Sequence, residues 1–139
     1  MLMGKFTHNL DAKNRLFIPA KHREQLGDSF VITCNVDKCL SVYSMEEWEK
    51  YTAKLSELPA IQSREIIRYL CATAAEVQPD AQGRVLIPAD LIAYANIQKG
   101  AVIVGHLNYA EIWSEERWNE INSVDKTESI LQQMMNLGL

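Results

Sequence analysis

The sequence predicts a mixed α+β fold with a mainly β core, made of two similar units in a pseudo-twofold arrangement with short flanking helices. Three observations support this prediction. The ten residues 11–20 return as residues 80–89 with six identical positions. Short alternating apolar segments, typical of half-buried strands, surround both copies. Two copies are too few for a solenoid, which favours a pair of units that close on each other.

The repeat extends beyond these two stretches. Residues 40–48 align with residues 110–118, and both segments pass from a strand through an aromatic residue and a serine into a helix with a tryptophan. The first unit therefore covers residues 5–47 and the second covers residues 76–119, with a helical linker at 48–75 and a helical tail at 120–139. One unit alone would bury too little apolar surface to be stable. We expect the two units to share a core or to gain one from other chains.

The elements of the first unit follow from local signals. We expect a strand at 4–10, a turn at 11–14, a returning strand at 15–18 and a helix at 20–26 that starts after Pro19 and ends at Gly27. A second hairpin follows, with strands at 29–34 and 39–43. Ser44 and Glu47 have the spacing of a capping box, which predicts a helix that reaches residue 55. Its apolar stripe consists of Trp48, Tyr51 and Leu55.

The linker and the second unit are read in the same way. Pro59 interrupts the chain, and residues 63–71 read as a helix with Ile66, Ile67 and Leu70 facing inward. After an extended segment, the second unit repeats the order with a turn at 80–83, a strand at 84–87, a helix at 88–95, a hairpin at 101–113 and a helix from residue 114. A last helix runs from about 124 to 135, with Asp125 and Glu128 resembling a capping box. Its stripe packs either on the body or, as we favour slightly, on a neighbouring chain; it consists of Ile130, Leu131, Met134 and Met135.

Composition limits the class of protein. With 139 residues, 47% of them hydrophobic, the chain has the composition of a soluble globular protein. No apolar run has the length of a transmembrane helix, and the N-terminal residues lack the apolar core of a signal peptide. We therefore expect a cytoplasmic protein without a membrane partner.

The three cysteines, Cys34, Cys39 and Cys71, are odd in number and form no Cys-x-x-Cys, which argues against a disulfide framework. One alternative is a metal site that combines Cys34 and Cys39 with His8, His22 or His106. The spacing matches no known ligand pattern. The simpler interpretation is that the cysteines act as small apolar residues, and we expect no metal and no cofactor.

Charge is distributed unevenly along the chain. The net charge is −4, but residues 1–27 contain five basic and two acidic side chains, whereas the second unit contains three basic and six acidic ones. The first turn therefore lies at the basic end of an acidic protein. One basic patch is weak evidence for DNA contact, whereas many such patches side by side in an oligomer would be strong evidence.

The two turns, Asp-Ala-Lys-Asn-Arg and Asp-Ala-Gln-Gly-Arg, carry the candidate function. The aspartate at the head of each turn can accept hydrogen bonds from backbone amides two residues later, and Asn14 and Gly83 supply residues that tolerate positive φ. The arginine can pair with the aspartate, so that the turn only pins a hairpin. Alternatively, its planar guanidinium extends outward and binds phosphate or a guanine edge. The presence of the pair in both copies favours the second interpretation.

A catalytic alternative uses the same residues. Asp11 and Asp80 could form a carboxylate dyad for general acid–base hydrolysis. Such a dyad shares a proton, whereas each aspartate here has an arginine four residues later that favours the ionised form. The chain contains no Ser–His–Asp or Cys–His set with plausible context and no phosphate-binding glycine loop. We therefore expect no enzymatic activity and no small-molecule substrate.

The paired motifs resemble one known family. The two Asp-x-x-x-Arg turns, each followed by Ile-Pro-Ala and later by an aromatic-Ser-x-Glu-x-Trp segment, together with the opening Met-x-Met-Gly, resemble the MraZ family of bacterial transcription regulators. The likeness extends from residue 3 to about residue 119. It implies two AbrB/SpoVT-type swapped-hairpin, β-barrel-like units per chain and a ring-shaped homo-oligomer, an octamer or dodecamer. It also implies a cytoplasmic, nucleoid-associated protein that regulates its own division and cell-wall gene cluster.

The resemblance also implies the site and the partner, which is double-stranded DNA with closely spaced direct repeats. The family's loops contact DNA at the positions of Asp11, Lys13, Asn14, Arg15, Asp80, Gln82, Gly83 and Arg84. The family usually has Gly where this chain has Asn14, which makes contact of the Asn14 side chain with DNA possible. A different class of function remains open: an oligomeric scaffold, or an antitoxin-like partner, whose loops bind protein without DNA specificity.

Overall fold

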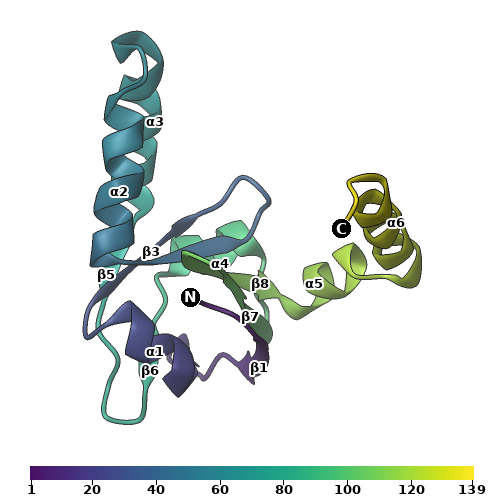
Figure 1. Ribbon diagram of the computed structural model, residues 1–139. Helices are drawn as coiled ribbons and strands as arrows, with labels where there is room; N and C mark the ends of the chain where they lie inside the picture. The colour runs from purple at the N-terminus through teal and green to yellow at the C-terminus, as the bar shows by residue number, and fades with distance from the viewer.

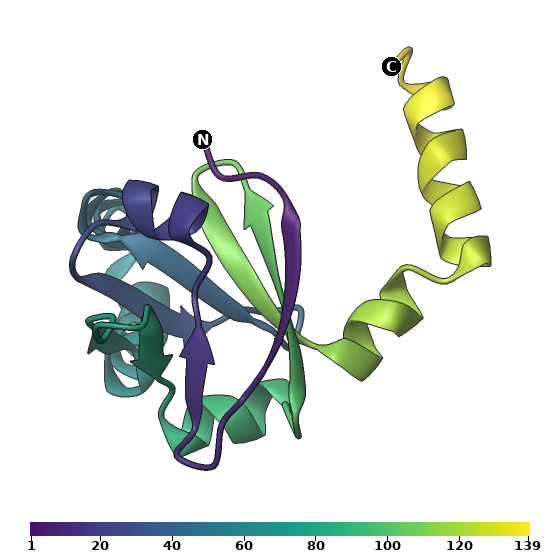
Figure 2. The same ribbon diagram turned by 90° about the horizontal axis from the view of Figure 1, so that it is seen from below.

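Pairs of strands alternate with one or two helices along the chain in the computed structural model, which describes residues 1–139 (Figures 1 and 2). The strands are β1 (Lys5–Asn9), β2 (Arg15–Phe17), β3 (Phe30–Cys34), β4 (Leu40–Ser44), β5 (Ala75–Val77), β6 (Arg84–Leu86), β7 (Gly100–His106) and β8 (Tyr109–Ser114). The helices are α1 (Ala20–Leu26), α2 (Met45–Ser56), α3 (Ala60–Thr73), α4 (Ala89–Ala95), α5 (Glu115–Ile121) and α6 (Val124–Asn136). The predicted mixed α+β class is confirmed.

Local signals gave most of these boundaries. Helix α1 has the predicted bounds, and the Oγ atom of Ser44 accepts a hydrogen bond from the Glu47 backbone at 3.2 Å, as a capping residue does. Helix α3 is longer than the predicted helix at 63–71. Pro59 does not interrupt the chain well before the helix, but directly precedes its first residue. Helix α6 is capped by Ser123, whereas the predicted capping residue Asp125 lies in its first turn.

The large sheet is antiparallel and has the order β1-β7-β8-β4-β3-β5. Strand β1 of the first unit pairs with β7 of the second, and β5, which leads into the second turn, pairs with β3 of the first unit. The strands β1, β3 and β4 of the first unit correspond to β5, β7 and β8 of the second. Exchanging each strand with its counterpart reverses the order of the sheet, which is therefore pseudo-twofold symmetric. The expected barrel-like closure is wrong: β1 and β5 form two free edges, because β2 and β6 pair with each other in a separate ribbon.

The β2–β6 ribbon holds the two turns close together. Its register pairs Leu16 with Val85, and two further hydrogen bonds extend it symmetrically, from Ile18 N to the Gly83 carbonyl at 3.0 Å and from Ile87 N to the Asn14 carbonyl at 2.9 Å. Each strand has three residues, so the starts of the two strands lie only about 7 Å apart along the ribbon.

One core serves both units, as expected. The twin residues Leu16 and Val85 are fully buried, and so are Ile18 and Ile87. Both pairs belong to a single apolar cluster with residues from β3, β4, β7 and β8; these include Phe30, Ile32, Leu40, Val42, Ile103 and Ile112. Burying one such side chain contributes roughly 1.5–3 kcal/mol, so neither unit retains its apolar stabilisation without the other.

Helices α2 and α3 lie outside this core and are only partly covered. Helices α2 and α3 pack on each other and project from the body (Figure 1). Trp48 on α2 is only half-buried against Tyr43, with ring centroids 5.9 Å apart. Leu70 on α3 is buried as predicted, but the prediction that Ile66 faces inward is wrong, since 42% of Ile66 is exposed.

Helix α6 stands away from the body (Figure 2). Every one of its residues is exposed, including the predicted stripe of Ile130, Leu131, Met134 and Met135. The alternative in which this stripe packs on the body is therefore wrong, and the stripe is uncovered within the chain.

The cysteines are all free thiols. Cys34 ends β3 and Cys39 precedes β4, both buried, and burial raises the pKa of the Cys39 thiol far above its usual value. Cys71 lies on α3, in the predicted helix, but it is exposed and not packed as the expected small apolar residue. No three His, Cys, Asp or Glu side chains lie close enough together to hold a metal ion. None of the helices has the length and apolar composition that crossing a membrane requires.

Candidate nucleic-acid interface

The first loop, residues 11–15, is a turn held by its own aspartate. The Asp11 Oδ1 atom accepts hydrogen bonds from the backbone N–H groups of Lys13 at 2.9 Å and Arg15 at 2.8 Å. Its Oδ2 atom accepts a third from the Arg15 Nε atom at 2.7 Å. Asn14 has φ of 61°, in the left-handed region that asparagine tolerates better than most residues. One carboxylate therefore joins the middle and the end of the loop, and it also orients the Arg15 guanidinium.

The second loop, residues 80–84, repeats this geometry. The Asp80 Oδ1 atom accepts from the backbone of Gln82 and of Arg84, both at 2.9 Å, and its Oδ2 atom accepts from the Arg84 Nε atom at 3.0 Å. Gly83 takes the left-handed position with φ of 82°. In both loops the aspartate accepts the same three hydrogen bonds from the same relative positions, so the repeated sequence has a repeated local geometry.

The two loops also contact each other. The Arg84 Nη1 atom lies 3.6 Å from the Asp11 Oδ2 atom, the same oxygen that binds the Arg15 Nε atom. The two guanidinium groups therefore converge on one carboxylate oxygen. About 31% of each arginine side chain is exposed, so the pair lies at the surface and forms one site.

The two arginines are not equally available. The Arg84 Nη2 atom donates to the Gln82 side chain at 3.3 Å, and its Nη1 atom faces Asp11. Arg15 uses only its Nε atom within the chain, which leaves Nη1 and Nη2 for a partner. Lys13, between the aspartate and the arginine of the first loop, is exposed. The first loop therefore offers the Arg15 Nη atoms and the Lys13 ammonium group to a partner, whereas the Nη atoms of Arg84 in the second loop already face groups of the chain.

Both aspartates are ionised at neutral pH. Hydrogen bonds from the Arg15 backbone, the Arg15 side chain and the Lys13 backbone lower the pKa of Asp11 below its usual value. The backbone N–H groups of Arg84 and Gln82 and the Arg84 side chain lower the pKa of Asp80 in the same way. A proton-sharing dyad needs one protonated carboxyl, which is the opposite charge state.

Comparison with known proteins identifies the family. The sequence profile of the family described as "MraZ protein, putative antitoxin-like" matches residues 1–66 and 70–137. Relatives named "Transcriptional regulator MraZ" align with the whole chain, at 44% identity in Lachnoclostridium phytofermentans over 99% of that protein, and at 43% in Clostridium tetani and 45% in Thermoanaerobacter sp. over the full length of each. The chain belongs to the MraZ family.

In this MraZ chain, the eight residues predicted for the site occupy two loops that contact each other. Four come from the first loop and four from the second; they are Asp11, Lys13, Asn14, Arg15, Asp80, Gln82, Gly83 and Arg84. The sequence did not reveal the contact between Arg84 and Asp11, because it depends on how distant strands pair. It also missed Arg23 on α1, whose guanidinium lies against Gly83. No signal in the sequence identified it, because Arg23 lies outside the repeated motif.

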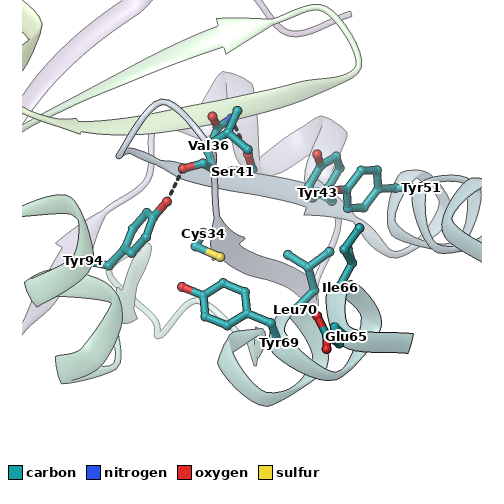
Figure 3. Close-up of a pocket in the computed structure, with 11 residues that line it drawn as sticks. Cys34, Val36, Ser41, Tyr43, Tyr51, Glu65, Ile66, Tyr69, Leu70 and Tyr94 are labelled. Carbon is teal, nitrogen blue, oxygen red and sulfur yellow. Dashed lines mark hydrogen bonds between the residues drawn. The ribbon is translucent and has the colours of Figure 1, made fainter. Parts of the chain in front are cut away.

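A separate pocket of about 510 Å³ lies between α2, α3, α4 and the β3–β4 hairpin (Figure 3). Tyr69, Tyr94 and the Cys34 thiol border it, and the Tyr94 hydroxyl donates to the Asn35 carbonyl at 2.5 Å. No residue of 11–15 or 80–84 lines it. Its walls are mainly apolar and aromatic, and they suit an apolar group better than a phosphate.

Proposed function

We propose that this protein is a DNA-binding transcriptional regulator that acts without catalysis. The observation that carries the proposal is the convergence of Arg15 and Arg84 on the Asp11 Oδ2 atom, which makes one exposed cationic site from two distant loops. Guanidinium groups on rigid turns suit bidentate contacts to phosphate and to guanine edges. The name of the MraZ relatives, transcriptional regulator, points to the same function.

The proposed ligand is a duplex with closely spaced direct repeats near the protein's own promoter, in a gene cluster for division and the cell wall. One subunit has few cationic loop residues and an overall net charge of −4. Tight binding therefore needs the loops of several subunits on one face, so that phosphate contacts accumulate. A ring of subunits related by rotation suits direct repeats, whereas a twofold dimer suits a palindrome.

Two uncovered apolar surfaces support the oligomer. One is the stripe on α6, and the other is the face of α3 around the pocket, where Ile66 and Tyr69 are exposed. Surfaces of this kind mark interaction sites in soluble proteins. The exchange of first strands between the units, β1 with β7 and β5 with β3, supports the AbrB-type swapped-hairpin interpretation of the fold. A cytoplasmic, nucleoid-associated location follows from the proposed DNA binding.

The test begins with the selection of bound fragments from random duplex DNA, followed by the binding of the selected duplex to the parent and to Arg15→Ala. We expect Arg15→Ala to bind more than tenfold more weakly at moderate salt and to keep the parent's mass in light scattering. Lys54→Ala is the control, because Lys54 is exposed on α2, away from both loops. An assembled parent that selects no sequence would contradict the proposal and favour the protein-binding scaffold.

A further inference from the structure

The second loop has a cation that does not belong to its own unit. Arg23 lies in the last turn of α1, and its Nε atom donates to the Ile18 carbonyl at 2.8 Å. Its guanidinium carbon lies 5.5 Å from the centroid of the Phe17 ring. Helix α1 follows β2, and β2 pairs with β6, so this side chain of the first unit reaches the loop of the second.

Gly83 provides the space for this guanidinium. A Cβ atom built on Gly83 would lie 2.7 Å from the Arg23 Cζ atom and 2.9 Å from its Nη2 atom. These distances are shorter than real carbon contacts, so a side chain at position 83 would displace Arg23. At the equivalent place in the first loop, Asn14 carries a side chain, and the residue equivalent to Arg23 is Ile92, which packs against the core. Gly83 is therefore compatible with the position of Arg23, whereas a side chain at this place is not.

The same comparison explains the charges of the two loops. The first loop has Lys13 and Arg15 against Asp11, whereas the second has only Arg84 against Asp80, because Gln82 replaces the lysine. Arg84 is engaged by Gln82 and Asp11. Arg23 adds the missing positive charge. Its Nη1 and Nη2 atoms have no hydrogen-bond partner in the chain, although Glu24, Asp28 and Asp80 line the adjacent hollow.

We infer that Arg23 is a phosphate-binding residue of the second loop, and that it does there what Lys13 does in the first. The inference rests on the proposed DNA binding. The Nε atom and the Phe17 ring fix the guanidinium, and the free Nη atoms present parallel N–H donors to a phosphate. Each subunit then offers two cations at each loop, with the second pair drawn from both units.

The direct test compares Arg23→Gln and Arg23→Lys with the parent on the selected duplex over a range of salt concentrations. Loss of one phosphate contact reduces the magnitude of the slope of log K against log salt by about 0.9 and weakens binding about tenfold at 0.1 M salt. Where several subunits bind one duplex, this change is counted once for each bound subunit. We expect this loss for Arg23→Gln. Arg23→Lys keeps the positive charge but lacks the guanidinium that contacts the Ile18 carbonyl and the Phe17 ring. We expect this variant to retain most of the parent's salt dependence. Equal losses in both variants would assign Arg23 a structural role and overturn the inference.

A second test leaves every charge in place. Gly83→Asn installs in the second loop the residue that the first loop tolerates, and it should displace Arg23 and reproduce the loss of slope. The double variant Gly83→Asn with Arg23→Gln should be no worse than either single change. Gly138→Asn is the matched control, because Gly138 also has positive φ but a Cβ atom built there meets nothing within 4 Å, and it should leave the slope unchanged. A parent that binds no duplex would refute the proposed function itself, whereas a binding parent with an unchanged Arg23→Gln slope would refute only the role of Arg23.

Discussion

The Arg84 Nη1 atom lies 3.6 Å from the Asp11 Oδ2 atom, across the ribbon that joins the two units. Arg84 also pairs with Asp80 in its own loop at 3.0 Å. This arginine therefore connects two loops that are far apart in the sequence, whereas Arg15 pairs only with the aspartate of its own loop. The two arginines occupy equivalent positions in the repeat, but only Arg84 contacts the aspartates of both loops.

Replacing Arg84 should have a different effect from replacing Arg15. We expect Arg84→Ala to weaken binding to the selected duplex less than Arg15→Ala, because the Nη atoms of Arg84 already face Gln82 and Asp11. It should also lower the midpoint of thermal unfolding more than Arg15→Ala does, since it removes the link between the loops. Anisotropy titrations and melting curves of both variants give the comparison. Equal losses of affinity would mean that Arg84 turns outward when DNA binds.

Asp11 should contribute more to stability than Asp80. The Asp11 Oδ2 atom faces two guanidinium groups, whereas the Asp80 Oδ2 atom faces one. We therefore expect Asp11→Asn to lower the urea midpoint more than Asp80→Asn, although the backbone hydrogen bonds of the two turns are alike. Chemical unfolding of the two variants at pH 7 is the measurement. A larger loss for Asp80→Asn would show that the link between the loops adds little.

Acid should remove this contribution. The folded state lowers the pKa of Asp11 and of Asp80 below the ordinary value near 3.8. The stabilisation is therefore fully present above about pH 4 and is lost as the pH falls through the lowered pKa values. Unfolding curves of the parent and of Asp11→Asn, measured from pH 7 to pH 2, should converge at the acid end. A constant difference across this range would exclude the linkage.

The two serine caps form a matched pair. The Ser44 Oγ atom accepts from the Glu47 backbone at 3.2 Å, and the Ser114 Oγ atom accepts from the Arg117 backbone at 3.1 Å. Loss of a serine cap costs about 1 kcal/mol, so Ser44→Ala and Ser114→Ala should each lower the free energy of unfolding by that amount. Ser129→Ala, on exposed α6, is a control outside the caps. An effect below about 0.3 kcal/mol for both caps would show that packing alone holds α2 and α5.

Gly105 should not accept a side chain. A Cβ atom built there would overlap the Met3 nitrogen and the Leu2 carbonyl group, both of which are backbone atoms. Gly105→Ala should therefore push the N-terminal segment off β7 and cost about 1–3 kcal/mol. Gly100→Ala is the contrasting variant, because its nearest obstacle is the flexible end of the Glu115 side chain. Thermal unfolding of the two should separate them, and equal midpoints would mean that the N-terminal segment moves freely.

The sequence predicted the elements of this fold better than their arrangement. Helix α1 and the capped start of α2 follow from residues next to each other in the chain, so Pro19, Gly27 and Ser44 were sufficient to place them. The pairing of β2 with β6 depends on segments far apart in the sequence, and no local pattern specifies it. The open sheet was missed for this reason.

For the site, too, the sequence predicted the local features but not the contacts between distant segments. The repeat identified both loops and their aspartate–arginine pairs, because each pair lies within one turn. Arg23 lies outside the repeated motif and reaches the second loop only through the β2–β6 pairing. Ile66 was assigned to the core because apolar spacing on a helix identifies a face, but not whether the chain itself covers that face.

The crossed pairing of the edge strands has a consequence for how such a molecule can assemble. Strand β1 completes the sheet beside β7, and β5 completes it beside β3. A polypeptide with only one of the two halves would lack a strand and could gain it only from another molecule, at a rate that depends on concentration. Joining both halves in tandem makes that encounter intramolecular, so the sheet forms equally well in dilute solution.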